Sequence, residues 1–277
     1  MFVPGYSQVT VIMVITYRVP SAMSSARERE YQVIAGRAPK AAMIVAQHII
    51  RDSTRLGLTA GDLLPPERMM LETYDIGRGT LREALRLLEF QGVIALKPGP
   101  KGGPILLDPD GSHLASSLIL LMQLKHAPFS AIVEARTALE PMISRLAAER
   151  ITDDDLVAIK ATIDQMRYSV ADQHVFLEAN KSFHDLIAWS SGNPIFGYMV
   201  DSLVGIMDGT VIGIDYPAHR RKEILEVHSS IYESLARRDP VESEERMRDH
   251  INSYTRYAQK KYPDLLGEVI QWDRALS

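Results

Sequence analysis

Three histidines and one asparagine are the residues of this chain whose types and spacing best suit a metal ion. Asn180 and His184 are four residues apart in a helical pattern, so both project from one face of a helix. His228 lies eleven residues before Asp239, and His250 lies eleven residues after it. In an antiparallel helical hairpin that turns at Asp239, both histidines lie roughly 16 Å from the turn at 1.5 Å per residue. The three imidazoles can therefore converge, and three nitrogen ligands with one oxygen suit Zn²⁺, Ni²⁺ or Mn²⁺.

Each of these histidines has a plainer interpretation as a hydrogen-bonded core residue, which is the commoner role of a single buried histidine. Asn180 offers a neutral amide oxygen, which is a weaker ligand than a carboxylate. It would leave more positive charge at the site for an anion. The other five histidines, including His48 and His174, are interpreted as surface or core residues.

Arg136 is the residue best suited to hold an organic acid beside such a metal, because a guanidinium group binds a carboxylate through two parallel hydrogen bonds. Glu140, four residues later, offers the alternative of an intrahelical ion pair. Arg220 and Arg221 are weaker candidates for the same role. Three further side chains could line the cavity or belong to ordinary core: Tyr198, Asp201 and Met207.

The elements that carry these residues are helical throughout residues 128–265, where no strand pattern and no repeat occurs. Thr152 suits an N-cap, and three aspartates follow it at the positive end of the helix dipole. The pattern predicts an all-α bundle of about six helices, with a linker at 108–127 and a tail at 266–277. We expect these helices at 129–150, 152–170, 172–190, from 193 onward, 218–238 and 241–261, and a linking helix at 113–124.

A second region, residues 37–107, has a different pattern. Pro65 and Pro66 suit the first turn of a helix, and Gly77 suits a tight turn because it tolerates backbone angles that other residues resist. Gly92 suits the end of the next helix. In order, we expect helices at 67–74 and 78–91 and strands at 93–96 and 104–107, which is the layout of a winged helix-turn-helix.

The second of these helices carries three arginines on one face: Arg78, Arg82 and Arg86. The alternative is a solvated cationic face paired with Glu83 and Glu89. The preceding turn and the basic wing favour DNA, because guanidinium groups fit phosphates and guanine edges. The residues expected to contact DNA are Arg68, Arg78, Thr80, Arg82, Lys97, Lys101 and Gly102.

Charge is divided between the two regions. The chain has 277 residues and a net charge of −4, but residues 37–107 hold 10 Lys and Arg against 7 Asp and Glu. Residues 108–277 hold 18 against 26. The positive charge is therefore concentrated where DNA contact is expected. Cysteine is absent, which excludes disulfides and thiolate metal sites, and no apolar run is long enough to span a membrane.

The first 36 residues do not share the pattern of the rest. Their apolar stretch at 9–15 is too short to span a membrane, and no basic segment precedes it as in a secretory signal. We interpret residues 1–36 as a disordered leader or as the product of a mis-assigned start, since Met13 and Met23 are alternative starts. A functional amphipathic arm is the other interpretation.

Residues 37–107 resemble the DNA-binding domain of the GntR family of bacterial transcription regulators, through GDLLPPER, RGTLREALRLLEFQGVI and the glycine-bearing wing. The helical region resembles the FCD effector domain of the FadR subfamily, through EARTALEP, RLAAER, NKSFHDLIAWSSGNP, EVHSSIYESLARRDP and RMRDHI. The resemblance covers about residues 37–262. Two positions depart from the family pattern. Gly77 replaces the usual serine or threonine before the recognition helix, and Asn180 replaces the frequent aspartate ligand.

The resemblance implies a cytoplasmic, ligand-responsive regulator that is not an enzyme. It would bind double-stranded operator DNA as a homodimer, because two heads with two-fold symmetry read a palindrome. A small carboxylate would be its effector, bound by Arg136 beside the metal. Two alternatives stay open: a metal-dependent hydrolase or oxygenase that uses the three histidines, and a structural bundle without a ligand.

Overall fold

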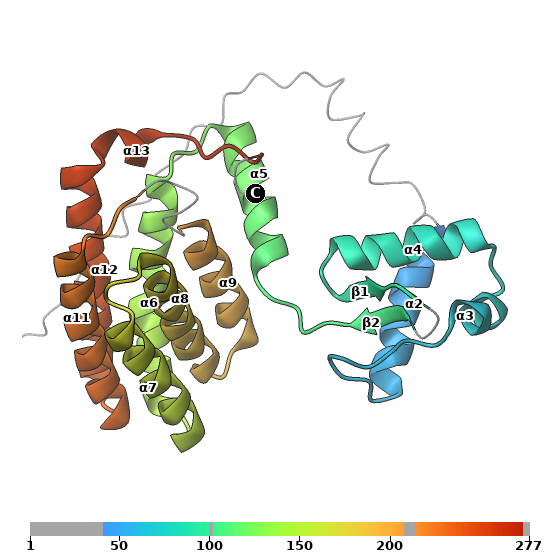
Figure 1. The fold of residues 1–277 in the computed structure, drawn as a ribbon, viewed down its shortest axis with the longest axis horizontal. Helices are drawn as coiled ribbons and strands as arrows, with labels where there is room; N and C mark the ends of the chain where they lie inside the picture. The colour runs from blue at the N-terminus through green and yellow to red at the C-terminus, as the bar shows by residue number, and fades with distance from the viewer. Residues whose placement is uncertain (1–40, 100–101, 208–213, 274–277) are drawn as a thin grey trace, which may run out of the picture.

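The computed structural model describes residues 41–99, 102–207 and 214–273. These residues form a smaller lobe from α2 to β2 and a larger, wholly helical lobe, with the helix α5 between them (Figure 1). The described strands are β1 and β2 alone, and all other described elements are helices. The expected fold class, mainly α with a winged helix-turn-helix and an all-α bundle, is confirmed.

The smaller lobe is built around α4 (Arg78–Phe90), which packs against α2 (Ala41–Arg55) and α3 (Glu67–Tyr74). The apolar side chains spaced three and four apart along α4 are all buried: Leu81, Ala84, Leu85 and Leu88. Burial of a leucine side chain contributes about 1.5–3 kcal/mol, so this stripe fixes the arginine-bearing face of α4 outward. The wing follows as the antiparallel pair β1 (Ile94–Lys97) and β2 (Gly103–Leu106).

The turn between α3 and α4 differs from our expectation in one detail. Asp75 is the residue in the left-handed region, with φ 49°, and its N–H closes the end of α3 on the carbonyl of Leu71. Gly77 has φ −77°, a value open to any residue, and serves as the N-cap of α4 without a side-chain hydrogen bond. The short polar side chain of Asp75 tolerates the left-handed conformation better than most residues do.

The segment before α3 lies against the wing, which the sequence did not indicate. The N–H of Leu64 donates to Pro104 at 2.8 Å, and the N–H of Leu106 donates to Asp62 at 2.9 Å. Leu63 forms an isolated bridge with Ile105. Residues 61–64 therefore extend the two-stranded sheet on the β2 side and anchor the wing to the start of α3.

The larger lobe buries one main hydrophobic core that includes Phe129, Phe176 and Phe183. Thr152 is the N-cap of its helix, as expected, and in addition forms a capping box with Asp155. Asp239 caps the second helix of the terminal hairpin. The predicted continuation of the fourth helix through 208–213 lies outside the described residues, and a short α13 was not predicted. The helices are α6 (Ser130–Arg150), α7 (Asp153–Tyr168), α8 (Gln173–Ser190), α9 (Pro194–Ile206), α11 (Ala218–Ala236), α12 (Pro240–Lys261) and α13 (Pro263–Gly267).

The two lobes meet at α5 (Ser112–Lys125), which packs against α9. His113 lies against the end of α4: its ring centroid is 6.4 Å from that of Phe90. A Cβ added at Gly92 would lie 2.2 Å from the His113 ring, so no larger residue fits at this contact without movement. Among the described helices, none has the length and apolar character needed to cross a membrane.

Candidate functional site

The three histidines of interest come from three helices of the larger lobe and meet in its interior. His184 lies on α8, His228 on α11 and His250 on α12. Asp239 is the N-cap of α12, and its side chain accepts a hydrogen bond from Glu242 N. The helical hairpin therefore turns at the residue midway between His228 and His250, which brings the two imidazoles to the same height as the sequence predicted.

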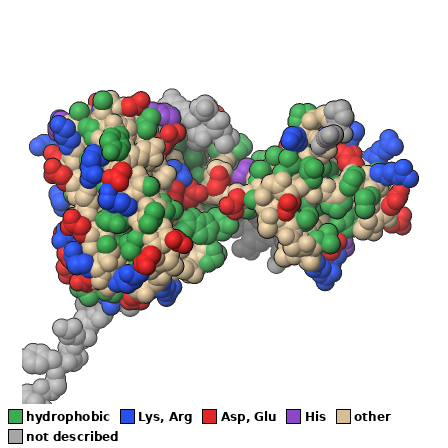
Figure 2. Space-filling view, turned by 60° about the horizontal axis from the view of Figure 1, so that its bottom comes forward, with side chains coloured by type: hydrophobic (Ala, Val, Ile, Leu, Met, Phe, Trp, Pro, Cys, Tyr) green, Lys and Arg blue, Asp and Glu red, His purple; other side chains and the backbone are tan. Residues whose placement is uncertain are grey.

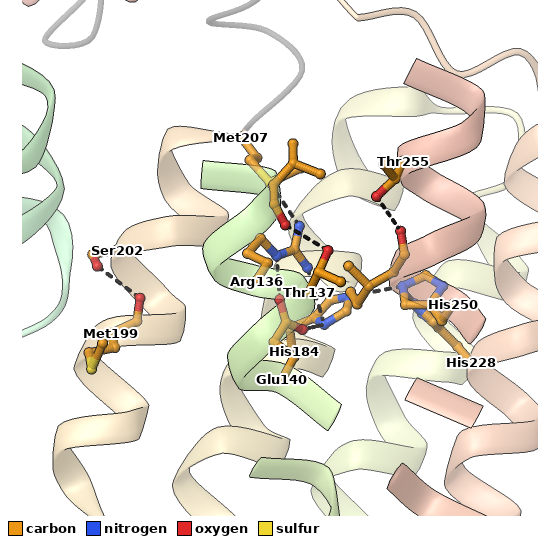
Figure 3. Close-up of polar contacts among 12 residues, drawn as sticks. Arg136, Thr137, Glu140, His184, Met199, Ser202, Met207, His228, His250 and Thr255 are labelled. Atoms are coloured by element: carbon orange, nitrogen blue, oxygen red, sulfur yellow. Dashed lines mark hydrogen bonds and ion pairs between the residues drawn. The ribbon is translucent and has the colours of Figure 1, made fainter. Parts of the chain in front are cut away.

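The ring nitrogens face one another. Nε2 of His228 is 3.1 Å from Nε2 of His250, and Nε2 of His250 is 3.3 Å from Nε2 of His184 (Figure 3). Candidate ligand atoms of all three lie within 4.8 Å of one another. Ligands at 2.0–2.1 Å from one ion are separated by about 2.8–3.4 Å in octahedral or tetrahedral geometry. The triad therefore fits a divalent ion held through three Nε2 atoms.

Glu140 fixes the orientation of one of these imidazoles. Its Oε2 is 2.6 Å from Nδ1 of His184, which leaves Nε2 of that ring directed toward the other histidines. The other oxygen of Glu140 accepts a hydrogen bond from Nε of Arg136. Figure 3 shows this sequence of contacts running from α6 to the histidines. Spacing in the sequence indicates Glu140 only as an ion-pair partner of Arg136 and gives no sign of its contact with His184, 44 residues away.

Burial dominates the electrostatics of the triad. His228 and His250 are 0% and 8% exposed. Burial lowers the pKa of His228 well below its ordinary value, and the neighbouring His250 adds to this effect. Burial and His184 lower the pKa of His250 in the same direction. Both rings are therefore neutral near pH 7, which is the form that binds a metal.

For the pKa of Glu140, charge interactions outweigh burial. Burial alone would raise its pKa, but the charge of Arg136 and the contact with His184 outweigh burial and hold its pKa well below the usual range. Glu140 is thus ionised, and its charge is compensated by a guanidinium group that is itself buried.

A pocket opens beside the triad, and half of the side chains proposed for an effector line it. Asn180, Arg136, Met207 and Arg220 line it together with His184 and His250. Four aromatic and charged side chains that the sequence does not single out also line it: Glu178, Lys181, Tyr216 and Tyr254. The Arg136 guanidinium reaches Met207 Sδ at 3.0 Å through Nη1 and His184 Nδ1 at 3.5 Å through Nη2. The ion pair with Glu140 is therefore present, and the terminal nitrogens of Arg136 lie near Met207 and His184, two residues that also line the pocket.

Three of the weaker candidates have other roles. Tyr198 is not among the pocket-lining residues and packs edge-on against Trp189, with centroids 5.0 Å apart. Asp201 bonds Lys181 and Gly111 instead of lining the pocket. Arg221 is buried and donates to backbone carbonyls, including that of Val170 at 2.7 Å, which explains its position in structural terms.

The residues proposed for DNA contact lie on the surface of the smaller lobe. Arg78, Arg82 and Lys97 are exposed, and the described ion pairs include no partner for Arg78, Arg82 or Arg86. The expected alternative of salt bridges to Glu83 and Glu89 is therefore absent from this part of the chain. Figure 2 shows lysine and arginine side chains gathered at the outer end of this lobe.

The remaining residues of the proposed DNA surface differ in exposure. Arg68 pairs with Glu72 at 3.2 Å, but its side chain is 90% exposed, and Thr80 is half-buried. Gly102 lies so close to the strand before it that a Cβ would stand 2.1 Å from the Lys97 carbonyl oxygen. The wing tip therefore needs glycine for its own packing. Lys101 lies outside the described residues.

Each lobe matches a known protein family. Residues 42–100 match the bacterial regulatory proteins of the gntR family, and residues 131–253 match the FCD domain. An uncharacterised HTH-type transcriptional regulator of Bacillus subtilis, YcbG, is 37% identical over 194 residues, which cover 70% of this chain and 79% of the relative. The HTH-type transcriptional repressor NanR of Cronobacter sakazakii is 28% identical over 224 residues, which cover 77% and 84%.

The solved structure of a Streptococcus agalactiae GntR protein is similar in fold, with a TM-score of 0.62 and 26% identity, covering 78% of this chain and 99% of that one. These families and relatives are transcription regulators, so the alternative of a hydrolase or oxygenase finds no support among them. The chain belongs to the GntR family of bacterial transcription regulators, with a winged helix-turn-helix that binds DNA and a C-terminal FCD domain.

Proposed function

We propose that this regulator is a cytoplasmic homodimer that binds a palindromic operator and responds to a small organic acid held beside a divalent metal in the FCD domain. The observation that carries the proposal is the combination, in one chain, of an exposed cationic recognition helix and a buried triad of histidines that borders a pocket. The first feature suits DNA and the second suits a metal with a small ligand.

In the smaller lobe, Arg78, Thr80 and Arg82 lie at the start of α4, the end of a recognition helix that usually meets base edges. Arg68 on α3 and the wing residues Lys97, Lys101 and Gly102 would approach phosphates on either side. Phosphate contacts fix the register of the protein on the duplex, and base contacts supply the specificity. The paired heads of a dimer would then read two half-sites.

The surface of α5 supports the homodimer. Leu121 and Leu124 on this helix are 57% and 68% exposed, and Leu114 is 39% exposed. A helix with apolar residues on most of its surface is ordinarily buried, whereas only Ile119 of α5 is fully covered. A second copy of the chain would cover these leucines and place two reading heads on one duplex.

In the larger lobe, His184, His228 and His250 would hold the metal, with Asn180 as an amide-oxygen ligand from the same face of α8. Zn²⁺, Ni²⁺ and Mn²⁺ all suit this donor set. A bound ion would supply a Lewis-acidic position for a ligand oxygen. Imidazole and amide ligands bring no charge of their own to a metal, so an ion bound there would keep its full positive charge available to an anionic effector.

Arg136 would bind the carboxylate of that effector beside the metal. Its Nε is engaged by Glu140, and its two terminal nitrogens point to Met207 and His184. A carboxylate that displaced the weak thioether contact would gain a charge-assisted hydrogen bond. The effector would favour one dimer geometry over another and so change the spacing of the heads.

Elemental analysis of protein purified without chelator or affinity tag tests the metal directly, and thermal melts with added Zn²⁺, Ni²⁺ and Mn²⁺ test it independently. We expect a bound divalent ion, or a rise in melting temperature with at least one of these metals, because an ion that binds only the folded state stabilises it. No metal and no thermal shift would mean that the histidines are core residues or direct effector ligands.

A further inference from the structure

The wall of the effector pocket formed by α8 includes Lys181, whose ammonium group is tied to two carboxylates. Its Nζ is 2.7 Å from Asp185 on the same helix and also forms an ion pair with Asp201 of α9. The Lys181 side chain is 39% exposed, whereas the Asp201 side chain is 12% exposed. A cation that an incoming ligand can reach is thus paired with an anion that is nearly buried.

Asp201 in turn holds the linker between the lobes. Its Oδ2 accepts a hydrogen bond from the N–H of Gly111 at 2.6 Å. Gly111 packs so tightly there that a Cβ would lie 2.6 Å from the backbone nitrogen of Ser202. The φ of Gly111 is −78°, which any residue adopts, so glycine is required for the close approach and not for the backbone conformation.

The linker then contacts the recognition helix. His113, two residues after Gly111, lies against Phe90 at the end of α4 and against Gly92 just beyond it. Three successive contacts therefore lead from the pocket to the DNA-binding lobe: Lys181 to Asp201, Asp201 to Gly111, and His113 to the end of α4.

We propose that Lys181 is the pocket residue that senses the effector and that Asp201 and Gly111 transmit its occupancy to the reading head. This proposal rests on the proposed function of the pocket as an effector site. An anionic group that enters the pocket competes with Asp201 for the Lys181 ammonium. Asp201 then loses its cationic partner, its hold on Gly111 weakens, and α5 changes its position against the end of α4.

Hydrogen exchange on the full-length protein tests this connection without an effector. In Lys181→Met and Asp201→Asn, exchange of the amides of residues 110–114 should rise about tenfold, because a charge-assisted hydrogen bond is weakened or lost. Exchange at residues 90–93, which contact His113, should rise with it. Lys181→Arg keeps the cation and should retain most of the wild-type protection.

Lys160 offers a matched control on α7, since its Nζ lies 2.6 Å from Asp164 in an i,i+4 pair but has no contact with the linker. Lys160→Met should leave both segments unchanged. Gly111→Ala removes no charge. It should raise amide exchange in both segments, because the added methyl group displaces the linker from α9. Wild-type exchange at 110–114 in both Asp201→Asn and Gly111→Ala would overturn the proposal. A rise at 110–114 without any rise at 90–93 would overturn it as well, since the connection would end at α5.

DNA binding gives the functional readout, with a duplex selected by the wild-type protein from random sequences. Lys181→Met should change its Kd about fivefold or more, in the range of ordinary allosteric couplings, while Lys160→Met should not change it. Unaltered affinity in Lys181→Met would overturn the proposal. If the wild-type protein selected no duplex at all, the proposed function would fail, and the exchange experiment would decide the connection by itself.

Discussion

The two lobes use polar side chains in opposite ways. In the smaller lobe the arginines of the recognition helix are exposed and have no ion-pair partner among the described residues, and the core beneath them is apolar. In the larger lobe the polar residues beside the histidine triad are buried and bonded to one another, as with Arg136, Glu140 and His184 at 6%, 3% and 2% exposure. Side chains that bind a macromolecule can be exposed to solvent before binding, whereas those that bind a small ligand must already be desolvated and held in place before the ligand enters. Substitutions should therefore affect binding alone in one lobe, and binding together with stability in the other.

The largest effect is expected at Glu140. Glu140→Ala leaves the buried guanidinium of Arg136 without its counter-ion and frees Nδ1 of His184, so the free energy of unfolding should fall by about 3–5 kcal/mol. Denaturant unfolding measures this. Glu149→Ala is the control from the same helix, because its pair with Arg145 is exposed and spans 3.7 Å, and should cost less than about 1 kcal/mol. Equal losses in the two variants would remove the contrast between buried and exposed polar groups.

The next effect concerns the metal. Zn²⁺ at 100 times its Kd should stabilise the wild-type protein by about 2.7 kcal/mol, and His250→Ala should abolish this gain because one of three nitrogen ligands is lost. Thermal melts with and without Zn²⁺ provide the measurement. His174 is an exposed histidine on α8, and His174→Ala should keep the full gain. Stabilisation that survives in His250→Ala would place the metal elsewhere.

In the smaller lobe, Arg78→Ala and Arg82→Ala should each weaken operator binding by about 1–3 kcal/mol if the side chain reads a base edge. Their free energies of unfolding should stay within about 0.5 kcal/mol of the wild-type value, because both side chains are exposed. Fluorescence anisotropy with operator DNA and denaturant unfolding give the two numbers. Unchanged operator affinity in the double variant would defeat the assignment, and a large loss of stability would contradict the comparison.

The smallest effect is expected at the wing. Lys97→Ala should weaken specific and non-specific DNA about equally and reduce the slope of log K against log salt by about one, as for a single phosphate contact. Binding titrations at several salt concentrations measure the slope. A loss of affinity confined to one operator sequence would show that Lys97 contacts bases. The wing would then contribute to sequence specificity and not only to the position of the protein on the duplex.

Local patterns in the sequence were sufficient for much of this molecule. The apolar spacing of α4 predicted its buried stripe, and Thr152 marked a helix start through a capping preference that acts within four residues. The meeting of His228 and His250 could be predicted because a hairpin about one turn relates the two residues by symmetry.

Contacts that depend on how helices pack could not be predicted in this way. Glu140 and His184 lie 44 residues apart, and Gly111 and Asp201 lie 90 residues apart, with no intervening turn that would relate their heights. A glutamate four residues after Arg136 reads equally well as a surface ion pair, and only the packing of α6 against α8 turns it toward an imidazole. The isolated bridge of Leu63 with β2 could not be predicted either, because a single residue shows no alternation of apolar and polar side chains.

The contact between His113 and Gly92 has a consequence for engineering. In a two-domain regulator, the DNA-binding domain of one protein can be fused to the effector domain of another so that a gene responds to a new ligand. Here the junction is closely packed, because a side chain at position 92 would collide with the His113 ring unless that ring moved. If the proposed connection from the pocket to the reading head holds, a hybrid cut within residues 108–111 should bind its operator but lose its response to an effector when the incoming linker lacks a ring at 113 or the head lacks glycine at 92. Hybrids that carry both residues of this contact from the same parent should remain inducible.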